Sequence, residues 1–264
     1  MVTSYLDQIV TWHRQRAAED NREWRDRRRR VANGRPPFRQ ALERSAGAPV
    51  AVIGELKRRS PSKGWLAADL DVVTMARRYV EAGVAAISVL TDTEFFSGTL
   101  GDLETVSSNV TAPLLRKDFT VCENDVLDAR DAGASAVLLI TTALSDDELV
   151  RFQALAHEVG LDALVEVHDY DEASRALAAG ATLIGVNQRD LKTFEVNPAH
   201  AASVVDAVRS EGVVTVCESA ISTLADVQRA ADAGYDAVLV GEAFVTAADP
   251  AATVRSFASI RPRS

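Results

Sequence analysis

The chain of 264 residues has few cysteines, few lysines and no long apolar runs, and each of these shortages excludes some classes of protein or site. No apolar run approaches the roughly 20 residues of a membrane-spanning helix, and the N-terminus lacks the compact apolar stretch of a signal peptide. Two cysteines, Cys122 and Cys217, are too few for a disulfide framework, so we expect both to be reduced and structural. These absences predict a cytoplasmic protein with no membrane partner.

Lysine is scarce relative to arginine. Of the 29 basic residues, 25 are arginine and only four are lysine, namely Lys57, Lys63, Lys117 and Lys192. Arginine cannot be deprotonated in a protein, whereas burial and neighbouring charges can move the pKa of a lysine into a range useful for proton transfer. The places where this chain keeps lysine are therefore candidates for chemistry.

Negative charge predominates outside the N-terminal segment. The net charge is −9, but residues 1–45 carry 11 basic and six acidic side chains, so the rest of the chain is strongly acidic. An acidic body argues against a nucleic-acid surface. The shares of hydrophobic (47%) and charged (25%) residues are ordinary for a globular protein and exclude a disordered chain.

From about residue 49 onward, short apolar β-branched runs alternate with amphipathic helical stretches, which is the pattern of βα units. Their nearly continuous apolar character is typical of parallel strands covered by helices. The predicted strands are residues 50–56, 85–90, 113–116, 136–140, 163–167, 183–186, 213–217 and 237–240.

An internal repeat arranges these units in pairs. The segments AGVAAISVL, AGASAVLLI, AGATLIGV and AGYDAVLV place Gly83, Gly133, Gly180 and Gly234 at intervals of 50, 47 and 54 residues. Each interval holds two βα units, and each glycine stands where a helix ends before the next strand. Four pairs predict an α/β fold, a (βα)8 TIM barrel forming one domain over residues 1–264. An open doubly wound sheet would show no fourfold recurrence.

The first 45 residues lie outside the repeat. Tyr5, Leu6, Ile9 and Trp12 have helical spacing, and a strongly charged stretch follows them. We expect an N-terminal helical extension with one apolar stripe packed on the barrel. An arm that binds nucleic acid or a partner protein is the alternative.

Charged side chains gather where the predicted strands end, which is where barrel enzymes build their active sites. Glu55, Glu166 and Glu218 lie at the ends of the first, fifth and seventh strands, and Lys57 and Lys117 follow the first and third. Any one glutamate could belong to an internal salt bridge. Because each buried charge costs several kcal/mol before pairing, packing alone does not explain five of them on one rim. The cluster predicts proton-transfer chemistry.

The loops after the seventh and eighth strands are the usual phosphate-binding place of such barrels. Ser219 can donate a hydroxyl there, and Gly241 lets backbone N–H groups approach an anion. Ala220 is the weak point, because glycine is usual at a left-handed or close-approach position. The pattern predicts a small phosphorylated substrate, while Lys63 and Lys192 are expected to be solvated loop cations.

The sequence lacks the motifs of several other kinds of functional site. The histidines His13, His157, His168 and His200 show no ligand spacing, so we expect no metal. No G-x-S-x-G or G-x-G-x-x-G segment follows a strand, which disfavours a serine hydrolase and a dinucleotide-binding enzyme. We expect His168 to point to the opposite side of its strand from Glu166 and to be structural. Trp65 fits either a loop anchor or a lid.

Taken together, the rim segments resemble those of the indole-3-glycerol phosphate synthase family. The matching segments are VIGELKRRSPSKG, LTDTEFFSG, PLLRKDF, LVEVH, GVNQRDL, CES and LVGE, spread over residues 50–245 in the family's order. The resemblance implies a carboxy-lyase of tryptophan biosynthesis that closes the pyrrole ring of 1-(2-carboxyphenylamino)-1-deoxyribulose 5-phosphate and releases carbon dioxide and water. It implies no cofactor, and an extension over residues 1–45 that covers the barrel mouth. We further expect a monomer or a weak homodimer.

The same resemblance assigns roles to single residues. Lys117 is similar to the general acid that protonates the ribulose carbonyl, Lys57 to the ammonium that pairs with the substrate carboxylate, and Glu166 to the carboxylate of the dehydration step. The supporting polar residues are Glu55, Asn187, Glu218 and Arg189. The phosphate and ribulose contacts are Ser60, Ser219, Gly241 and the N–H of Glu242. The apolar slot for the anthranilate ring consists of Pro61, Phe96, Phe119, Leu138 and Leu191.

Three residues depart from the family's pattern. Gln188 stands where the family often has Asn or a small residue, Ala220 replaces a glycine, and Glu242 replaces a frequent serine. A glutamate beside a phosphate would repel it, so we expect the Glu242 side chain to turn outward. Two other functions stay open: an isomerase or lyase barrel for another phosphorylated sugar, and a non-catalytic barrel with a basic partner-binding arm.

Overall fold

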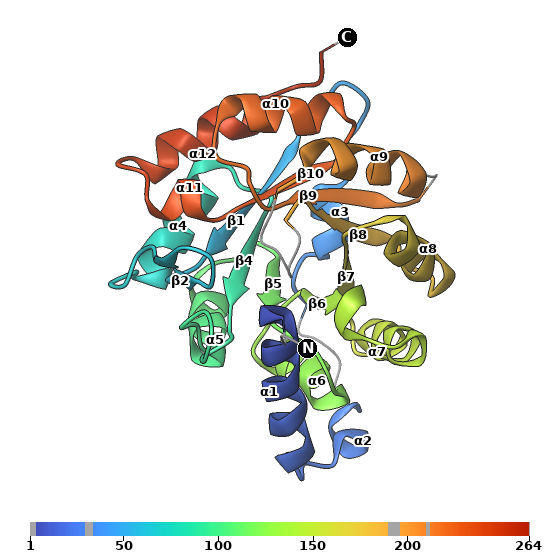
Figure 1. Cartoon of the computed structure of the whole chain (residues 1–264). Coiled ribbons are helices and arrows are strands. Elements are labelled where there is room, and N and C mark those ends of the chain that lie inside the picture. Colours follow the sequence, from blue (N-terminus) through green and yellow to red (C-terminus); the bar gives the residue numbers. More distant parts are fainter. Residues whose placement is uncertain (1–3, 30–33, 190–195, 210–211, 264) are drawn as a thin grey trace.

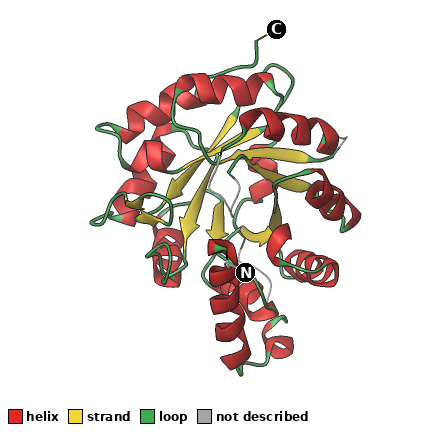
Figure 2. Cartoon of the chain, viewed as in Figure 1, coloured by secondary structure: helices red, strands yellow, loops and turns green. Residues whose placement is uncertain are grey.

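Eight parallel strands close into a barrel, and helices cover its outer face (Figures 1 and 2). The computed structural model describes residues 4–29, 34–189, 196–209 and 212–263. In order around the barrel, the strands are β1 (Ala51–Leu56), β10 (Ala237–Val240), β9 (Val214–Glu218), β8 (Leu183–Asn187), β7 (Asp162–Val167), β6 (Ala136–Ile140), β5 (Leu114–Lys117) and β4 (Ala86–Leu90), which pairs with β1.

Each barrel strand leads into a helix of the outer layer. These helices are α4 (Val72–Ala82), α5 (Leu100–Asn109), α6 (Glu123–Asp131), α7 (Asp146–Glu158) after the 3-10 turn η1 (Thr141–Ala143), α8 (Tyr170–Ala178), α9 (Pro198–Val208), α10 (Leu224–Asp232) and the pair α11 (Glu242–Val245) and α12 (Pro250–Ala258). The loop after β1 adds a small hairpin of β2 (Arg59–Ser60) and β3 (Gly64–Trp65). None of the described helices is both long and apolar enough to cross a membrane.

The sequence prediction of the barrel is confirmed. All eight predicted strands are present, and each observed end lies within one residue of the predicted one. The four glycines of the repeat have φ between 84° and 95°, the left-handed conformation that ends a helix before the next strand. The strands twist into a closed barrel because apolar residues on both faces are covered, by helices outside and by one another inside.

Two apolar clusters result from the alternation of side chains along the strands. The outer cluster packs strand residues such as Val52 and Val165 against the helices. The inner cluster fills the barrel with residues such as Ile53, Leu115 and Leu164. Because successive side chains point to opposite faces, a residue two positions beyond an inner residue again faces the barrel axis. Because of this alternation, polar residues at the ends of several strands face the barrel axis and lie close together at the mouth.

The N-terminal extension packs against both ends of the barrel. Its first helix, α1 (Tyr5–Glu19), buries Leu6 and Ile9 at the mouth, where the strands end. The short helix α3 (Phe38–Leu42) buries Phe38 and Leu42 completely in the same inner cluster, at the opposite end. The backbone N–H of Arg39 in α3 donates to the Asp162 carboxylate at the start of β7, at 2.8 Å. Helical spacing of Tyr5, Leu6, Ile9 and Trp12 predicted a helix near the N-terminus, where α1 lies, but sequence reasoning did not predict the α3 plug at the opposite end of the barrel.

Ion pairs to α6 hold the charged part of the extension against the barrel, and Figure 1 shows α1 and α2 (Trp24–Arg27) beside that helix. Arg16 donates to Asp125 at 2.6 Å, and Arg22 and Arg27 share Asp128 at 2.8 and 2.6 Å. The aspartates of these pairs are buried or nearly buried, at 0% and 10% exposed, while the arginines reach them from the surface. Much of the positive charge that distinguishes the extension is therefore matched by aspartates of the same chain.

We expect the α3 plug to be important for stability. Replacing Phe38 by alanine leaves a cavity in the inner core, and such truncations cost about 3–5 kcal/mol in the free energy of unfolding. Urea unfolding would measure this loss. Val150→Ala, on the exposed face of α7, is the control and should change stability by less than about 0.5 kcal/mol. Equal effects of the two substitutions would show that α3 is not part of the core.

Candidate active site

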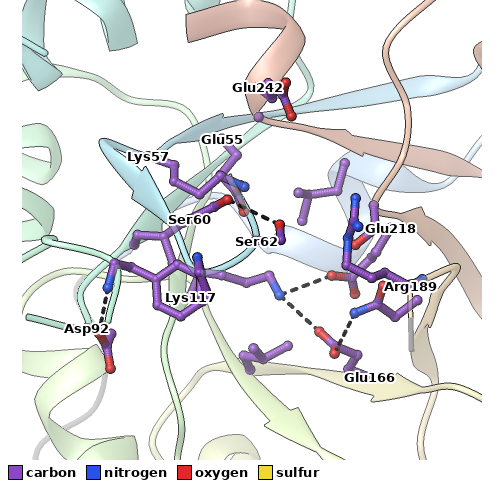
Figure 3. Close-up of a pocket in the computed structure, with 18 of the residues that line it drawn as sticks. Glu55, Lys57, Ser60, Ser62, Asp92, Lys117, Glu166, Arg189, Glu218 and Glu242 are labelled. Carbon is purple, nitrogen blue, oxygen red and sulfur yellow. Dashed lines mark hydrogen bonds and ion pairs between the residues drawn. The ribbon is translucent and has the colours of Figure 1, made fainter. Parts of the chain in front are cut away.

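A cavity of about 360 Å³ opens at the mouth of the barrel, where the eight strands end (Figure 3). Of the sixteen residues predicted for the site, fifteen line it, and Leu191 lies outside the described residues. Those fifteen are Glu55, Lys57, Ser60, Pro61, Phe96, Lys117, Phe119, Leu138, Glu166, Asn187, Arg189, Glu218, Ser219, Gly241 and Glu242. The structure thus brings together residues from all eight barrel strands and the loops that follow them.

The Lys117 ammonium lies between two buried carboxylates, and Figure 3 shows its side chain reaching across the cavity toward them. Its Nζ donates to Glu166 Oε2 at 2.9 Å and lies 3.2 Å from Glu218 Oε2. The other oxygen of Glu166, Oε1, accepts a hydrogen bond from the Asn187 side-chain amide at 2.9 Å. The side chains of Glu166 and Glu218 are 1% and 2% exposed, so water screens these charges very little.

These contacts separate the pKa values of the two carboxyls. Burial alone would raise the pKa of Glu166, but the charges of Lys117 and His168 and the Asn187 hydrogen bond outweigh burial and lower it. Burial raises the pKa of Glu218, and the Glu166 charge adds to this against the opposing effect of Lys117. Burial would lower the pKa of Lys117, but the surrounding carboxylates raise it. The site therefore holds an ionised Glu166, a protonated Lys117 and a Glu218 that keeps a proton more readily than a free glutamate.

The second lysine of the mouth is paired in the same way. Lys57 Nζ donates to Glu55 Oε1 at 2.5 Å, and the Glu55 side chain is 4% exposed. Gly241, at the end of β10, lies against this pair, because a Cβ there would overlap Glu55 Oε1 and approach Lys57 Nζ to 3.2 Å. Glycine at 241 therefore makes room for the ion pair as well as for a ligand.

Lys63 is an exposed loop cation, as expected, but it has a further role at the mouth. It lines the cavity, and its Nζ donates to Glu242 Oε1 at 2.7 Å. Both side chains are about half exposed, at 50% and 42%. The Glu242 carboxylate is thus neutralised by an ammonium from the loop after β1. Lys192 lies outside the described residues.

The turn after β9 has an unusual backbone. Ser219 and Ala220 have φ of 66° and 53°, in the left-handed region that side chains with a Cβ disfavour. The sequence concern about Ala220 is therefore confirmed: the position requires the conformation in which glycine is the usual choice. Such turns can present consecutive backbone N–H groups to an anion.

Apolar side chains line the other half of the cavity. Phe119 and Leu138 project from the barrel, and Leu6 and Ile9 of α1 complete the apolar wall. The extension therefore contributes directly to the lining of the cavity. Figure 3 also places Asp92 at this side of the mouth, below Lys117 in the view.

A buried histidine anchors α1 over the mouth. His13 Nε2 forms a 2.8 Å hydrogen bond with Asp92 Oδ2 and lies 3.8 Å from Asp118 Oδ1, and its ring stacks on Phe119. Although these three groups are close enough to hold a metal ion, their carboxylates are already hydrogen-bonded: Asp92 Oδ1 accepts the backbone N–H of Phe96 at 2.9 Å, for example. The sequence spacing did not reveal this cluster, because its members are far apart in the chain.

The prediction for His168 was wrong. Residues two positions apart on a strand share a face, so His168 lies on the same side as Glu166, and its Nε2 is 3.6 Å from Glu166 Oε1. Sequence reasoning also missed Gly185 on β8, where a Cβ would overlap Glu218 Oε1. A glycine inside the apolar strand LIGV was the available signal, since such glycines often mark a close approach.

Comparisons with known proteins agree with this site. The family model described as indole-3-glycerol phosphate synthase matches residues 6–257. The indole-3-glycerol phosphate synthase of Lactiplantibacillus plantarum is 45% identical over 92% of this chain and 94% of its own length. That of a Nocardioides species is 45% identical over 97% of this chain and 99% of its own.

Solved structures resemble the chain in fold. A 3-hexulose-6-phosphate synthase from Salmonella typhimurium matches with a TM-score of 0.64 and 19% identity, over 79% of this chain and 97% of its own. A thiamine phosphate pyrophosphorylase from Pyrococcus furiosus matches with a TM-score of 0.60 and 16% identity, over 83% of this chain and 95% of its own. At these identities the likeness concerns the barrel fold alone.

Gly185→Ala tests the role of space beside Glu218. The added methyl group would push the Glu218 carboxylate away from Lys117, and misplacement of about 1 Å in a catalytic site can cost up to about 100-fold in rate. We expect kcat to fall by about 10-fold to 100-fold with the circular dichroism spectrum unchanged. Gly101→Ala on α5, where a Cβ meets only ordinary contacts, is the matched control. A Gly185→Ala variant as active as that control would contradict the prediction.

Ala220→Gly tests the strain in the turn after β9. Glycine adopts a positive φ without the Cβ penalty, so we expect the variant to be more stable than the parent by up to about 1 kcal/mol. The exposed Ala18 of α1, in ordinary helical conformation, should show the opposite sign on replacement by glycine, a loss of about 0.5–1 kcal/mol. Thermal unfolding would compare the two, and a loss of stability in Ala220→Gly would show that the turn is not strained.

Proposed function

The chain belongs to the indole-3-glycerol phosphate synthase family, and from that membership we propose how its cavity performs the ring closure. The substrate is 1-(2-carboxyphenylamino)-1-deoxyribulose 5-phosphate, and the products are indole-3-glycerol phosphate, carbon dioxide and water. The observation that supports the proposal most strongly is the buried Lys117 ammonium between Glu166 and Glu218 at the strand ends.

Ring closure requires an acid at the ribulose carbonyl. When the aryl carbon that bears the carboxylate attacks this carbonyl, the ring loses aromaticity and negative charge develops on the carbonyl oxygen. Lys117 donates a proton to that oxygen, so a hydroxyl forms instead of an alkoxide. General acid–base catalysis of this kind is typically worth about 10²–10⁴-fold, and positioning and electrostatics supply the rest.

Glu218 can restore the proton that Lys117 gives up. The Lys117 ammonium is a weak acid in the ligand-free site, because the carboxylates around it raise its pKa. A neighbouring carboxyl that already holds a proton removes this difficulty, and Glu218 lies 3.2 Å from Nζ and has a raised pKa. We assign Glu218 as the proton reserve of Lys117.

Lys57 is placed to bind the substrate carboxylate. Its ammonium lies at the mouth, paired with Glu55, and a carboxylate ligand would take the place of that partner. Loss of carbon dioxide then restores the aromatic ring. Holding this carboxylate against an ammonium orients it until the new carbon–carbon bond has formed.

Dehydration completes the reaction and requires a base and an acid. Glu166 is ionised and oriented by Asn187, so it can accept the proton from the carbon next to the departing hydroxyl. The hydroxyl leaves as water after protonation by an ammonium of the mouth. Glu166 can serve as the base because it is ionised in the free site, and it can pass the proton to Lys117 once the ammonium has given its own proton to the departing hydroxyl.

The remaining groups position the substrate. Phe96, Phe119, Leu138 and Pro61 offer an apolar slot for the anthranilate ring, where exclusion of water strengthens the nearby charges. The phosphate would lie at the opposite end, against Ser60, Ser219, Gly241 and the N–H of Glu242, with Arg189 near the ribulose. Neutralisation of the Glu242 side chain by Lys63 removes its repulsion of a phosphate.

The alternatives fit the structure less well. An isomerase or lyase for another sugar phosphate would not need the apolar slot. A partner-binding basic arm would need free cations, whereas Arg16, Arg22 and Arg27 are paired with α6. We further propose a cytoplasmic enzyme that needs no cofactor or metal, acts as a monomer or weak homodimer, and has an extension that covers the mouth.

Lys117 provides the direct test of this mechanism. With the carboxyphenylamino substrate, appearance of indole fluorescence should report turnover by the purified protein. Lys117→Met and Lys117→Arg should both lower kcat by about 10²–10⁴-fold, because arginine keeps the charge but cannot release a proton. Arg151→Met on the exposed side of α7 removes a cation far from the site and should retain full activity. Full activity in Lys117→Arg would exclude proton donation by this residue.

A further inference from the structure

His168 is a buried titratable group that the mechanism above does not use. It follows β7, two residues beyond Glu166, and its side chain is 15% exposed. Its Nε2 is buried and has no hydrogen-bond partner among the described residues, although it lies 3.6 Å from Glu166 Oε1. A buried nitrogen aimed at a carboxylate oxygen without a settled hydrogen bond calls for a physical explanation.

The other side of the ring is held firmly. Nδ1 lies 2.9 Å from Glu172 Oε2, and the backbone N–H of His168 donates to the same oxygen at 2.8 Å. The Thr142 hydroxyl donates to the second oxygen of Glu172, and the N–H of Glu172 donates to Asp169 at the start of α8. Since Glu172 accepts from Nδ1, the Nδ1 proton is fixed, and only Nε2 can gain or lose a proton.

The charge state of the ring follows from its neighbours. Burial would lower the pKa of His168, but the hydrogen bond to Glu172 and the charges of Glu166, Glu172 and Glu218 outweigh burial and raise it. The imidazolium therefore persists to higher pH than in a free histidine. In that form Nε2–H points at Glu166 Oε1, whereas in the neutral form two lone pairs face each other.

We propose that His168, held by Glu172, is a positioning residue that acts through Glu166: as imidazolium it orients the Glu166 carboxylate toward Lys117 and keeps it ionised. Glu166 then has three positive or donating neighbours, namely Lys117 at Oε2 and Asn187 and His168 at Oε1. The proposal rests on the ring-closure function, in which Glu166 accepts a proton.

The sign of the pH dependence follows directly. Below the pKa of His168 the imidazolium holds Glu166, and as pH rises through that pKa the donor is lost, so kcat should fall on the alkaline side. The same protonation stabilises the fold at lower pH, and this stabilisation is lost as pH rises through the raised pKa. Removing Glu172 removes the main cause of the raised pKa, so the alkaline fall should then begin at lower pH.

Kinetics against pH would test the proposal with His168→Gln and Glu172→Gln. His168→Gln should lower kcat by about 10-fold to 100-fold, change KM by less than about twofold, and abolish the alkaline fall that belongs to His168. Glu172→Gln keeps the imidazole and should move that fall to lower pH. His157→Gln, on the exposed side of α7, is the matched control and should behave as the parent does. A His168→Gln variant with the parent's kcat and pH profile would overturn the proposal.

A second measurement does not depend on turnover. NMR titration of isotope-labelled histidine, with the His168 signal assigned by its loss in His168→Gln or His168→Asn, should show its pKa fall in Glu166→Gln. By reciprocity, the ionisation of Glu166 and that of His168 must shift each other equally. If the parent protein fails to turn over the substrate, the function is wrong, whereas an unchanged His168 pKa in Glu166→Gln would refute the coupling itself.

Discussion

The active site depends on one electrostatic constraint: a single ammonium, Lys117, serves two buried carboxylates. One positive charge cannot neutralise two negative charges in a poorly screened place, so Glu166 and Glu218 must differ in ionisation. The difference is set by their other neighbours, because Glu166 faces Asn187 and His168 whereas Glu218 has an oxygen without a hydrogen-bond partner among the described residues. The different roles proposed for Glu166 and Glu218 thus follow from the different surroundings of two identical side chains.

The barrel makes this constraint possible. Charges at a strand end can be buried only if the backbone that carries them is rigid, and the apolar layers below the mouth supply that rigidity. Arg116 and Asp118 flank Lys117 in the chain and pair with each other at 2.8 Å. Their ion pair helps to fix the end of β5, from which Lys117 reaches into the cavity. In the extension, Leu6 and Ile9 of α1 line the apolar half of the cavity, and His13 anchors this helix there.

Much of the fold and site could be predicted because strand ends and inward positions follow from periodicity. Lys117 and Glu218 were found in this way, as polar residues at the ends of apolar runs. Residues whose importance depends on a neighbour far away in the sequence were not predicted. Gly185 matters because the Glu218 side chain lies against it, and His13 matters because α1 folds back so that its ring reaches Asp92. The error at His168 came from the wrong parity along β7, not from missing information.

An acidic protein must still bind a substrate with carboxylate and phosphate groups, and the paired lysines resolve this difficulty. Lys57 is held by Glu55 and Lys63 by Glu242, so each of these two lysines already has an anion of the chain beside it. An anionic group of the substrate can then replace Glu55 or Glu242 as the partner of a lysine, so binding does not add uncompensated negative charge to the mouth. For Lys57, whose partner Glu55 is buried, this exchange also keeps the ammonium compensated before binding, which matters because breaking a buried pair is costly. Lysine, a compact point charge on a flexible stem, suits such an exchange better than the rigid fork of arginine.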